Sequence, residues 1–275
     1  VINSYDGTYG DLYYSVTDTD EVKISGCNET VESVEIPARI DGKRVTSIAK
    51  NAFYGCSDLT AITIPDSVTS FEGNAFSNLE NLTAITIPDS VTSIGESAFS
   101  GCTSLAEITI PDGMTEIVGS IFSDCTSLTS ITIPDSVTRV GYCAFRGCTN
   151  LAEITIPDNV TEIGEGVFSG CTSLTEITIP DSVTSIGGHA FSETPWLAEK
   201  QEENPLVVVN GILIDGTTCT DNVVIPDSVP SIGEYAFYRC LSMQEITLPG
   251  TLTEMQNSIF EECSSLANIE FPDKI

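Results

Sequence analysis

The sequence predicts an α/β-type repeat solenoid, built mostly of β-strands with short helical turns, in which successive units stack on one another. The first observation is a regular spacing of proline by 23 residues, at Pro65, Pro88, Pro111, Pro134, Pro157 and Pro180, resumed at Pro226, Pro249 and Pro272. The second is the same spacing of phenylalanine, at Phe53, Phe76, Phe99, Phe122, Phe145, Phe168 and Phe191, and again at Phe237 and Phe260. A spacing that keeps its phase along the chain indicates copies of one structural unit.

The first element of each unit is a short strand. In the unit from Cys171 to Glu193, the letters LTEITI place Ile177 and Ile179 on one face and Thr178 on the other. Alternation with a period of two is typical of a strand with one buried face. Pro180 then ends the strand, because proline has no N–H group to continue a backbone ladder.

Three shorter elements complete the unit. Asp181 and Ser182 supply turn chemistry, and residues 183–186 form a second extended segment. Gly187 is expected to let the chain swing back, and the closing letters HAFSE allow no more than one helical turn, which carries Phe191 inward. A single unit buries too little apolar surface to offset the conformational entropy that it loses. The units are therefore predicted to fold only as a stack.

The repeats are predicted to span residues 31–275, after an N-terminal β cap at residues 1–30 that contains two strands around a polar turn. Residues 192–222 are predicted to form one irregular turn rather than a domain boundary. Within them, ETPWLAEKQEEN indicates a short helix, and LVVVNGILIDG indicates a β-hairpin that turns at Asn210 and Gly211. The chain begins with Val1 rather than Met, which is expected of a mature or trimmed chain.

The charge of the chain limits its partners. Forty acidic residues against ten basic residues give a formal net charge of −30. Such a surface repels phosphates and anionic lipid head groups, so we expect no nucleic-acid partner. No apolar run approaches the roughly 18 residues that span a bilayer, so we expect no membrane insertion. The charge favours a soluble monomer, and attraction of cations or of a basic partner is the alternative role.

The repeat pattern C-x-x-L-x-x-I-x-I-P-x-x-V-x-x-I-G-x-x-A-F-x-x resembles the BspA-like (Treponema-type) leucine-rich repeats, most clearly from Ile87 to Leu105. The resemblance implies a right-handed superhelix with a parallel β-sheet on its concave face. It also implies an extracellular or cell-surface protein that adheres to a host or neighbouring-cell protein or glycan. No functional residue motif accompanies the resemblance, so it assigns no site residue.

The best candidate for ligand binding is the outward face of the strands that precede the prolines. Its predicted residues are Glu107, Thr109, Ser130, Thr132, Glu153, Thr155, Glu176 and Thr178. Aromatic residues, which anchor most tight protein interfaces, are missing from these positions. Threonine also favours strands, and repeat duplication copies it without selection for a ligand. A non-catalytic recognition module and a structural spacer that presents another domain are therefore both open.

The remaining chemistry-bearing residues follow the repeat rather than a catalytic pattern, so we predict no enzyme, cofactor or metal site. Seven cysteines share one repeat position, where stacked buried thiols, a disulfide such as Cys102–Cys125 and a metal site are the alternatives. His189, the only histidine, is expected at a partly exposed surface position. Aspartates follow the prolines and could cap turns or recruit Ca²⁺, at Asp66, Asp89, Asp112, Asp135, Asp158, Asp181, Asp227 and Asp273.

Overall fold

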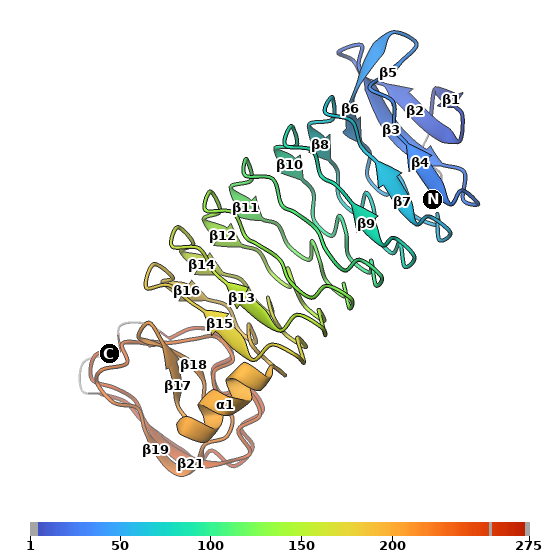
Figure 1. The fold of residues 1–275 in the computed structure, drawn as a ribbon. Coiled ribbons are helices and arrows are strands. Elements are labelled where there is room, and N and C mark those ends of the chain that lie inside the picture. The colour runs from blue at the N-terminus through green and yellow to red at the C-terminus, as the bar shows by residue number, and fades with distance from the viewer. Residues whose placement is uncertain (1–4, 253–254, 273–275) are drawn as a thin grey trace.

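The computed structural model describes residues 5–252 and 255–272, and it forms an elongated stack of coils (Figure 1). Each regular coil contributes up to two short strands, which pair in parallel with the same strands of the neighbouring coils. We call the strands before the prolines row A and the strands after them row B. A solenoid is the fold predicted from the repeat, and it is confirmed.

Row A contains the strands with the L-x-x-I-x-I pattern. Its members are β4 (Ser33–Glu35), β7 (Ala61–Thr63), β9 (Ala84–Ile85), β13 (Glu153–Thr155), β15 (Glu176–Thr178), β19 (Thr220–Val224), β21 (Ser242–Thr247) and β22 (Asn268–Glu270). They pair as three separate groups, β4-β7-β9, β13-β15 and β19-β21-β22, and a single bridge joins Ala84 to Glu107. Row A is therefore an interrupted sheet.

Row B contains the strands that follow the proline turns, together with β18 (Ile212–Asp215), which follows a hairpin turn. Its members are β6 (Lys43–Ile48), β8 (Ser70–Phe71), β10 (Ser93–Ile94), β11 (Glu116–Ile117), β12 (Arg139–Val140), β14 (Glu162–Ile163), β16 (Ser185–Ile186), β18 and β20 (Ser231–Ile232). From β6 to β16 the register of each pair advances by one repeat, so that Glu162 pairs with Arg139 on one side and with Ser185 on the other. An ion pair of 3.3 Å between Arg139 and Glu162 follows from this register.

The N-terminal segment extends row B with antiparallel strands. The strands β1 (Gly7–Tyr9), β2 (Leu12–Val16) and β3 (Val22–Cys27) form a meander, and β3 then pairs in parallel with β6. The sequence predicts two strands here, whereas the structure has three, because the letters before Leu12 also pair. A short strand, β5 (Arg39–Ile40), folds back on β6.

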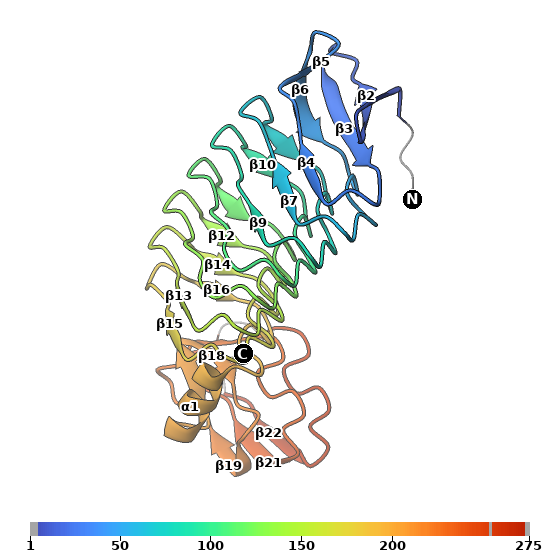
Figure 2. The ribbon, with the colours of Figure 1, turned by 45° about the vertical axis from the view of Figure 1, so that its right-hand side comes forward.

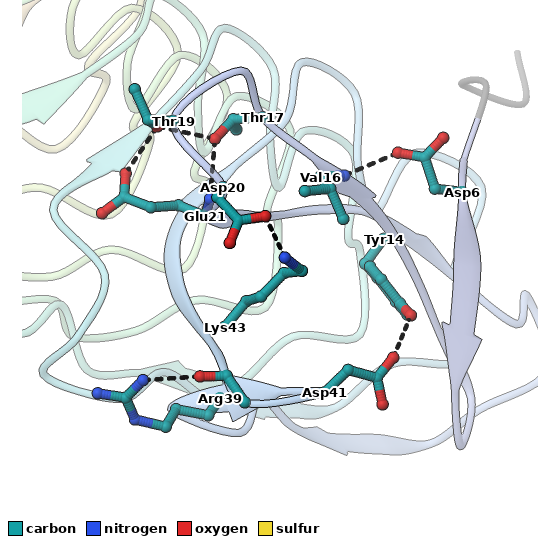
Figure 3. A network of polar contacts seen from close by, with 11 residues as sticks. Asp6, Tyr14, Val16, Thr17, Thr19, Asp20, Glu21, Arg39, Asp41 and Lys43 are labelled. Atoms are coloured by element: carbon teal, nitrogen blue, oxygen red, sulfur yellow. Dashed lines mark hydrogen bonds and ion pairs between the residues drawn. The ribbon is translucent and has the colours of Figure 1, made fainter.

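Polar contacts tie the β5–β6 hairpin to the N-terminal strands, as Figure 3 shows. The Tyr14 hydroxyl donates to the Asp41 carboxylate at 2.8 Å, and Lys43 forms an ion pair with Asp20. The Val16 N–H donates to Asp6 at 2.8 Å. The β5–β6 hairpin thus holds the N-terminal meander in place.

The irregular turn contains the one helix among the described residues, α1 (Pro195–Glu203), followed by a hairpin of β17 (Val207–Val209) and β18. Thr194 caps the helix by accepting a 3.1 Å hydrogen bond from the Leu197 N–H. The hairpin turns at Asn210 and Gly211, whose φ angles are 50° and 81°. Positive φ at both turn residues is the requirement of a tight hairpin turn that matches the strand twist.

Stacked phenylalanines run along the interior of the coils. Phe145 lies 5.6 Å from Phe168, centroid to centroid, and Phe168 lies 5.8 Å from Phe191, with nearly parallel rings. All three rings are buried. We call this series from Phe53 to Phe191, with Phe237 and Phe260 after the irregular turn, the phenylalanine ladder. The regular 23-residue spacing of phenylalanine is thus the spacing of one ring per coil.

Candidate functional site

All eight predicted ligand-binding residues are exposed. Glu153, Thr155, Glu176 and Thr178 lie in β13 and β15 of row A, and the other four hold the same repeat positions in coils that have no strand there. Pairing of β13 with β15 places Glu153 opposite Glu176 and Thr155 opposite Thr178. The isoleucine between each pair, Ile154 in β13, points to the core and is 4% exposed. The predicted alternation therefore holds in β13, and it delivers hydroxyl and carboxylate groups to one surface.

Six of the eight residues line one groove of about 460 Å³, which we call the row A groove. They are Ser130, Thr132, Glu153, Thr155, Glu176 and Thr178, and they come from three successive coils. Glu107 and Thr109 do not line it, because they belong to the coil before Ser130. The structure thus brings most, but not all, of the predicted residues together.

The groove lies where row A is interrupted. Within the described residues, no ladder pair joins residues 130–132 to β13, although the row B strands of the same coils, β12 and β14, are paired. Ile131 is consequently only partly buried, and it lines the groove beside Ile133 and Ile154. The floor of the groove is therefore apolar, and its rim is polar.

The charge of the groove is of one sign. Asp135, Glu153 and Glu176 line it, and its lining includes no lysine, arginine or histidine. Glu153 and Glu176 are direct partners in parallel strands. Like charges placed opposite each other in a sheet are unfavourable, so a cationic group in the groove would relieve their repulsion.

The repeated cysteines donate hydrogen bonds to the backbone. The thiol of Cys102 donates to the Phe76 carbonyl at 3.1 Å, and the thiol of Cys171 donates to the Phe145 carbonyl at 3.1 Å. Burial raises the pKa of each of these two thiols to about 12. The thiolate is the form that attacks electrophiles and binds metals, so these side chains act as internal hydrogen-bond donors at neutral pH.

His189 lies elsewhere, at the irregular turn. Its ring stacks on Tyr235 at a centroid distance of 4.8 Å and meets the edge of Tyr238 at 5.2 Å. This aromatic cluster was not predicted from the sequence. The signal was present, because Tyr235 follows His189 by twice the repeat length and so occupies the same repeat position.

The aspartates after the prolines do not gather into a metal site. Within residues 5–252 and 255–272, no group of three or more His, Cys, Asp or Glu side chains could hold a metal ion; Asp273 lies outside the described residues. Asp227 instead accepts a 2.7 Å hydrogen bond from the Gly250 N–H of the next coil. Capping of backbone groups is the role that this contact supports.

We expect millimolar calcium to raise the melting temperature by only a small, non-saturating amount. Calcium takes six to eight oxygen ligands in an ordered site, and a line of carboxylates on successive coils offers only diffuse attraction. Thermal melts followed by circular dichroism, with magnesium as the control cation, measure this effect. A sharp, saturating gain of about ten degrees with calcium alone would show an ordered site.

Among the residues that the structure describes, no helix has the length and the apolar character needed to cross a membrane.

Comparison with known proteins gives one family and several similar structures. The family model for the BspA type leucine rich repeat region matches residues 25–152, 144–201 and 215–275, with six copies. A leucine-rich repeat protein of T. pallidum is 31% identical, with a TM-score of 0.64, over 72% of this chain and 94% of that one. A search of curated protein sequences gives no match.

Two further structures cover almost the whole chain. A leucine-rich repeat protein of Bacteroides ovatus is 27% identical, with a TM-score of 0.58, over 98% of this chain and 89% of that one. A leucine rich cell surface protein of Faecalibacterium prausnitzii is 25% identical, with a TM-score of 0.51, over 98% of this chain and 95% of that one. These similarities extend through the irregular turn as well as the regular coils.

Proposed function

Because the chain belongs to the BspA-type leucine-rich-repeat family, we propose that it is a secreted or cell-surface recognition module that binds a protein or glycan partner without catalysis. Repeat solenoids of this kind present extended surfaces to their partners, and row A would line the concave side of a right-handed superhelix. The similarity to a cell surface protein of F. prausnitzii supports the location.

The observation that carries the proposal is the row A groove. It combines an apolar floor, a row of hydroxyl groups and three carboxylates that have no basic residue beside them in the lining. Hydroxyl and carboxylate groups around an apolar patch are the arrangement that fixes a partner by hydrogen bonds while burying apolar surface. The charge favours a partner that brings lysine or arginine side chains over one that is anionic.

The test is the replacement by lysine of Glu153 and Glu176, which line the groove, together with Glu107, which lies on the same face two coils before Glu153. The full chain and the variant are assayed against immobilised extracellular-matrix proteins and mucin glycans. We expect the variant to lose at least about tenfold in affinity for the partner that the native chain binds, because truncating or reversing interface charges costs several kcal/mol. Circular dichroism should show an unchanged fold, since all three side chains are exposed.

A matched control separates the groove from overall charge. The exposed Glu80, Glu165 and Glu202 lie outside the groove, and their replacement by lysine changes the net charge by the same amount. This control variant should bind like the native chain. Equal loss in both triple variants would contradict binding at the groove, and absence of any partner across the panel would favour a spacer that presents another domain.

A further inference from the structure

A second cavity, of about 250 Å³, lies at the irregular turn and shares no lining residue with the row A groove. We call it the island pocket. Its walls come from three segments, the coil around His189 and Phe191, the helix and hairpin at Gln201 and Asp215, and the coil of Tyr235 and Tyr238. Figures 1 and 2 both show α1 beside β15, at the point where the regular coils give way to the hairpin.

The pocket exists because the irregular turn interrupts the phenylalanine ladder. No phenylalanine occurs between Phe191 and Phe237. In the hairpin coil, Gly216 packs directly on Phe237, since a Cβ atom at this glycine would lie 2.3 Å from that ring. Trp196 covers the other side of the break by packing on Phe191 at 4.8 Å. One coil thus lacks an interior ring, and the pocket opens beside the last ring before it.

One wall of the pocket is a hydrogen-bonded polar cluster. The Asp215 carboxylate accepts three hydrogen bonds, from the Gln201 amide at 2.8 Å, from the Thr217 N–H at 3.2 Å and from the Thr217 hydroxyl at 3.0 Å. Burial raises the pKa of Asp215, and these hydrogen bonds oppose that rise. The bonds hold the carboxylate, the amide and the hydroxyl in fixed positions, which is the property of a prepared binding site.

The opposite wall is aromatic. His189 and Tyr235 stack, and Tyr238 meets both of them edge to face, at 5.2 Å from His189 and 5.9 Å from Tyr235. Arg239 lies over the Tyr238 ring at 5.9 Å. Each of these rings therefore packs against a neighbouring side chain. Tyrosine and histidine present an apolar ring together with a polar atom, and both can contact a ligand.

We propose that the island pocket binds one ring of a neutral saccharide. Its size admits a single small ring, below the volume of most drug-sized sites. Asp215 and the Thr217 hydroxyl oxygen accept hydrogen bonds, and the Gln201 amide both donates and accepts them, which matches sugar hydroxyls that do both. The aromatic wall matches the C–H face of a sugar ring. Asp215 and Glu193 both line the pocket, and their carboxylates disfavour phosphate and acidic sugars.

Trp196 provides the measurement. It is the only tryptophan of the chain and packs on Phe191, which lines the pocket. The full chain is titrated with glucose, galactose, mannose and N-acetylglucosamine. Binding is monitored by tryptophan fluorescence of the protein and by saturation-transfer NMR of the sugar. We expect saturable binding of at least one of them, with a dissociation constant on the order of 1 mM, because one small ring offers few contacts.

Variants locate the binding. Asp215→Asn and Gln201→Ala should each weaken it by about tenfold, the value of one well-placed hydrogen bond. Glu199→Ala, at an exposed position of the same helix, and the triple lysine variant at Glu107, Glu153 and Glu176 should leave the binding unchanged. Tetramethylammonium and inorganic phosphate are the comparison probes.

Three results would overturn the proposal. They are no saturation with any of the four sugars by either readout, equal binding by both pocket variants and the native chain, and tighter binding of tetramethylammonium or phosphate than of sugar. The last result would assign the pocket to a charged ligand. Because the groove variants and the pocket variants are separate, failure here does not bear on recognition at row A.

Discussion

Replacement of Phe168 by alanine is expected to lower the free energy of unfolding by about 3–5 kcal/mol. The ring is fully buried in a central coil and stacks on Phe145 and Phe191 at 5.6 and 5.8 Å. Its removal therefore takes away contacts with the coils on both sides and leaves a cavity between them. Urea denaturation followed by circular dichroism measures the loss.

Phe168→Ala should change the shape of the urea unfolding curve as well as its midpoint. Each coil of a solenoid contacts only its neighbours, so a weak central interface can let the two halves unfold separately. A lower dependence of the unfolding free energy on urea concentration (the m-value), or a second unfolding transition, would indicate that the two halves unfold separately. Phe271, which is 57% exposed, is the control, and its replacement by alanine should cost much less. A Phe168→Ala variant that unfolds like the native chain would refute the ladder as the core of the coils.

Regular features of the coils could be predicted from sequence because each depends only on neighbours one repeat away. Burial of Ile154 follows from the alternation, and burial of the ladder phenylalanines from Phe53 to Phe237 follows from the 23-residue spacing. The same rule fails at the last regular strand. Ile177 is predicted to be buried, yet it is partly exposed, because within the described residues no row A strand pairs with the outer edge of β15. Burial of Ile177 would require a row A strand one repeat later, and α1 occupies that place.

The two cavities could not be predicted, and the reasons differ. Residues 130–132 read SIT and β13 reads EIT, which is nearly the same as the sequences of the paired strands β7 (AIT) and β15 (EIT). The local sequence therefore does not indicate that residues 130–132 and β13 are unpaired. The island pocket depends on how the hairpin fits between two coils. Two features of the sequence indicate this pocket, the absence of phenylalanine between Phe191 and Phe237 and the presence of His189 and Tyr235 at the same repeat position. Both can be recognised only when the repeat register across the irregular turn is known.

Replacement of Gly164 by alanine is expected to destabilise the protein by about 1–3 kcal/mol, although the same change often stabilises a protein. Gly187, which is expected from the sequence to let the chain swing back, shares its repeat position with Gly95, Gly141 and Gly164. In the structure none of the four has a positive φ angle. A Cβ atom at Gly164 would instead lie 2.7 Å from the Tyr142 backbone nitrogen in the preceding coil. The glycine is needed for contact between coils, not for the turn.

The sign of the effect depends on what the methyl group meets. Alanine lowers the entropy of the unfolded chain, a gain of about 0.4–1 kcal/mol when the folded chain accommodates it. At Gly164 the obstacle is backbone, which cannot move without separating two coils, so overpacking outweighs the gain. Gly113 is the matched control, because its Cβ would meet nothing nearer than Thr92 Cγ2 at 3.9 Å. Urea midpoints should therefore fall for Gly164→Ala and stay level or rise for Gly113→Ala. Equal midpoints for the two variants would show that neighbouring coils are not in backbone contact at these repeated glycines.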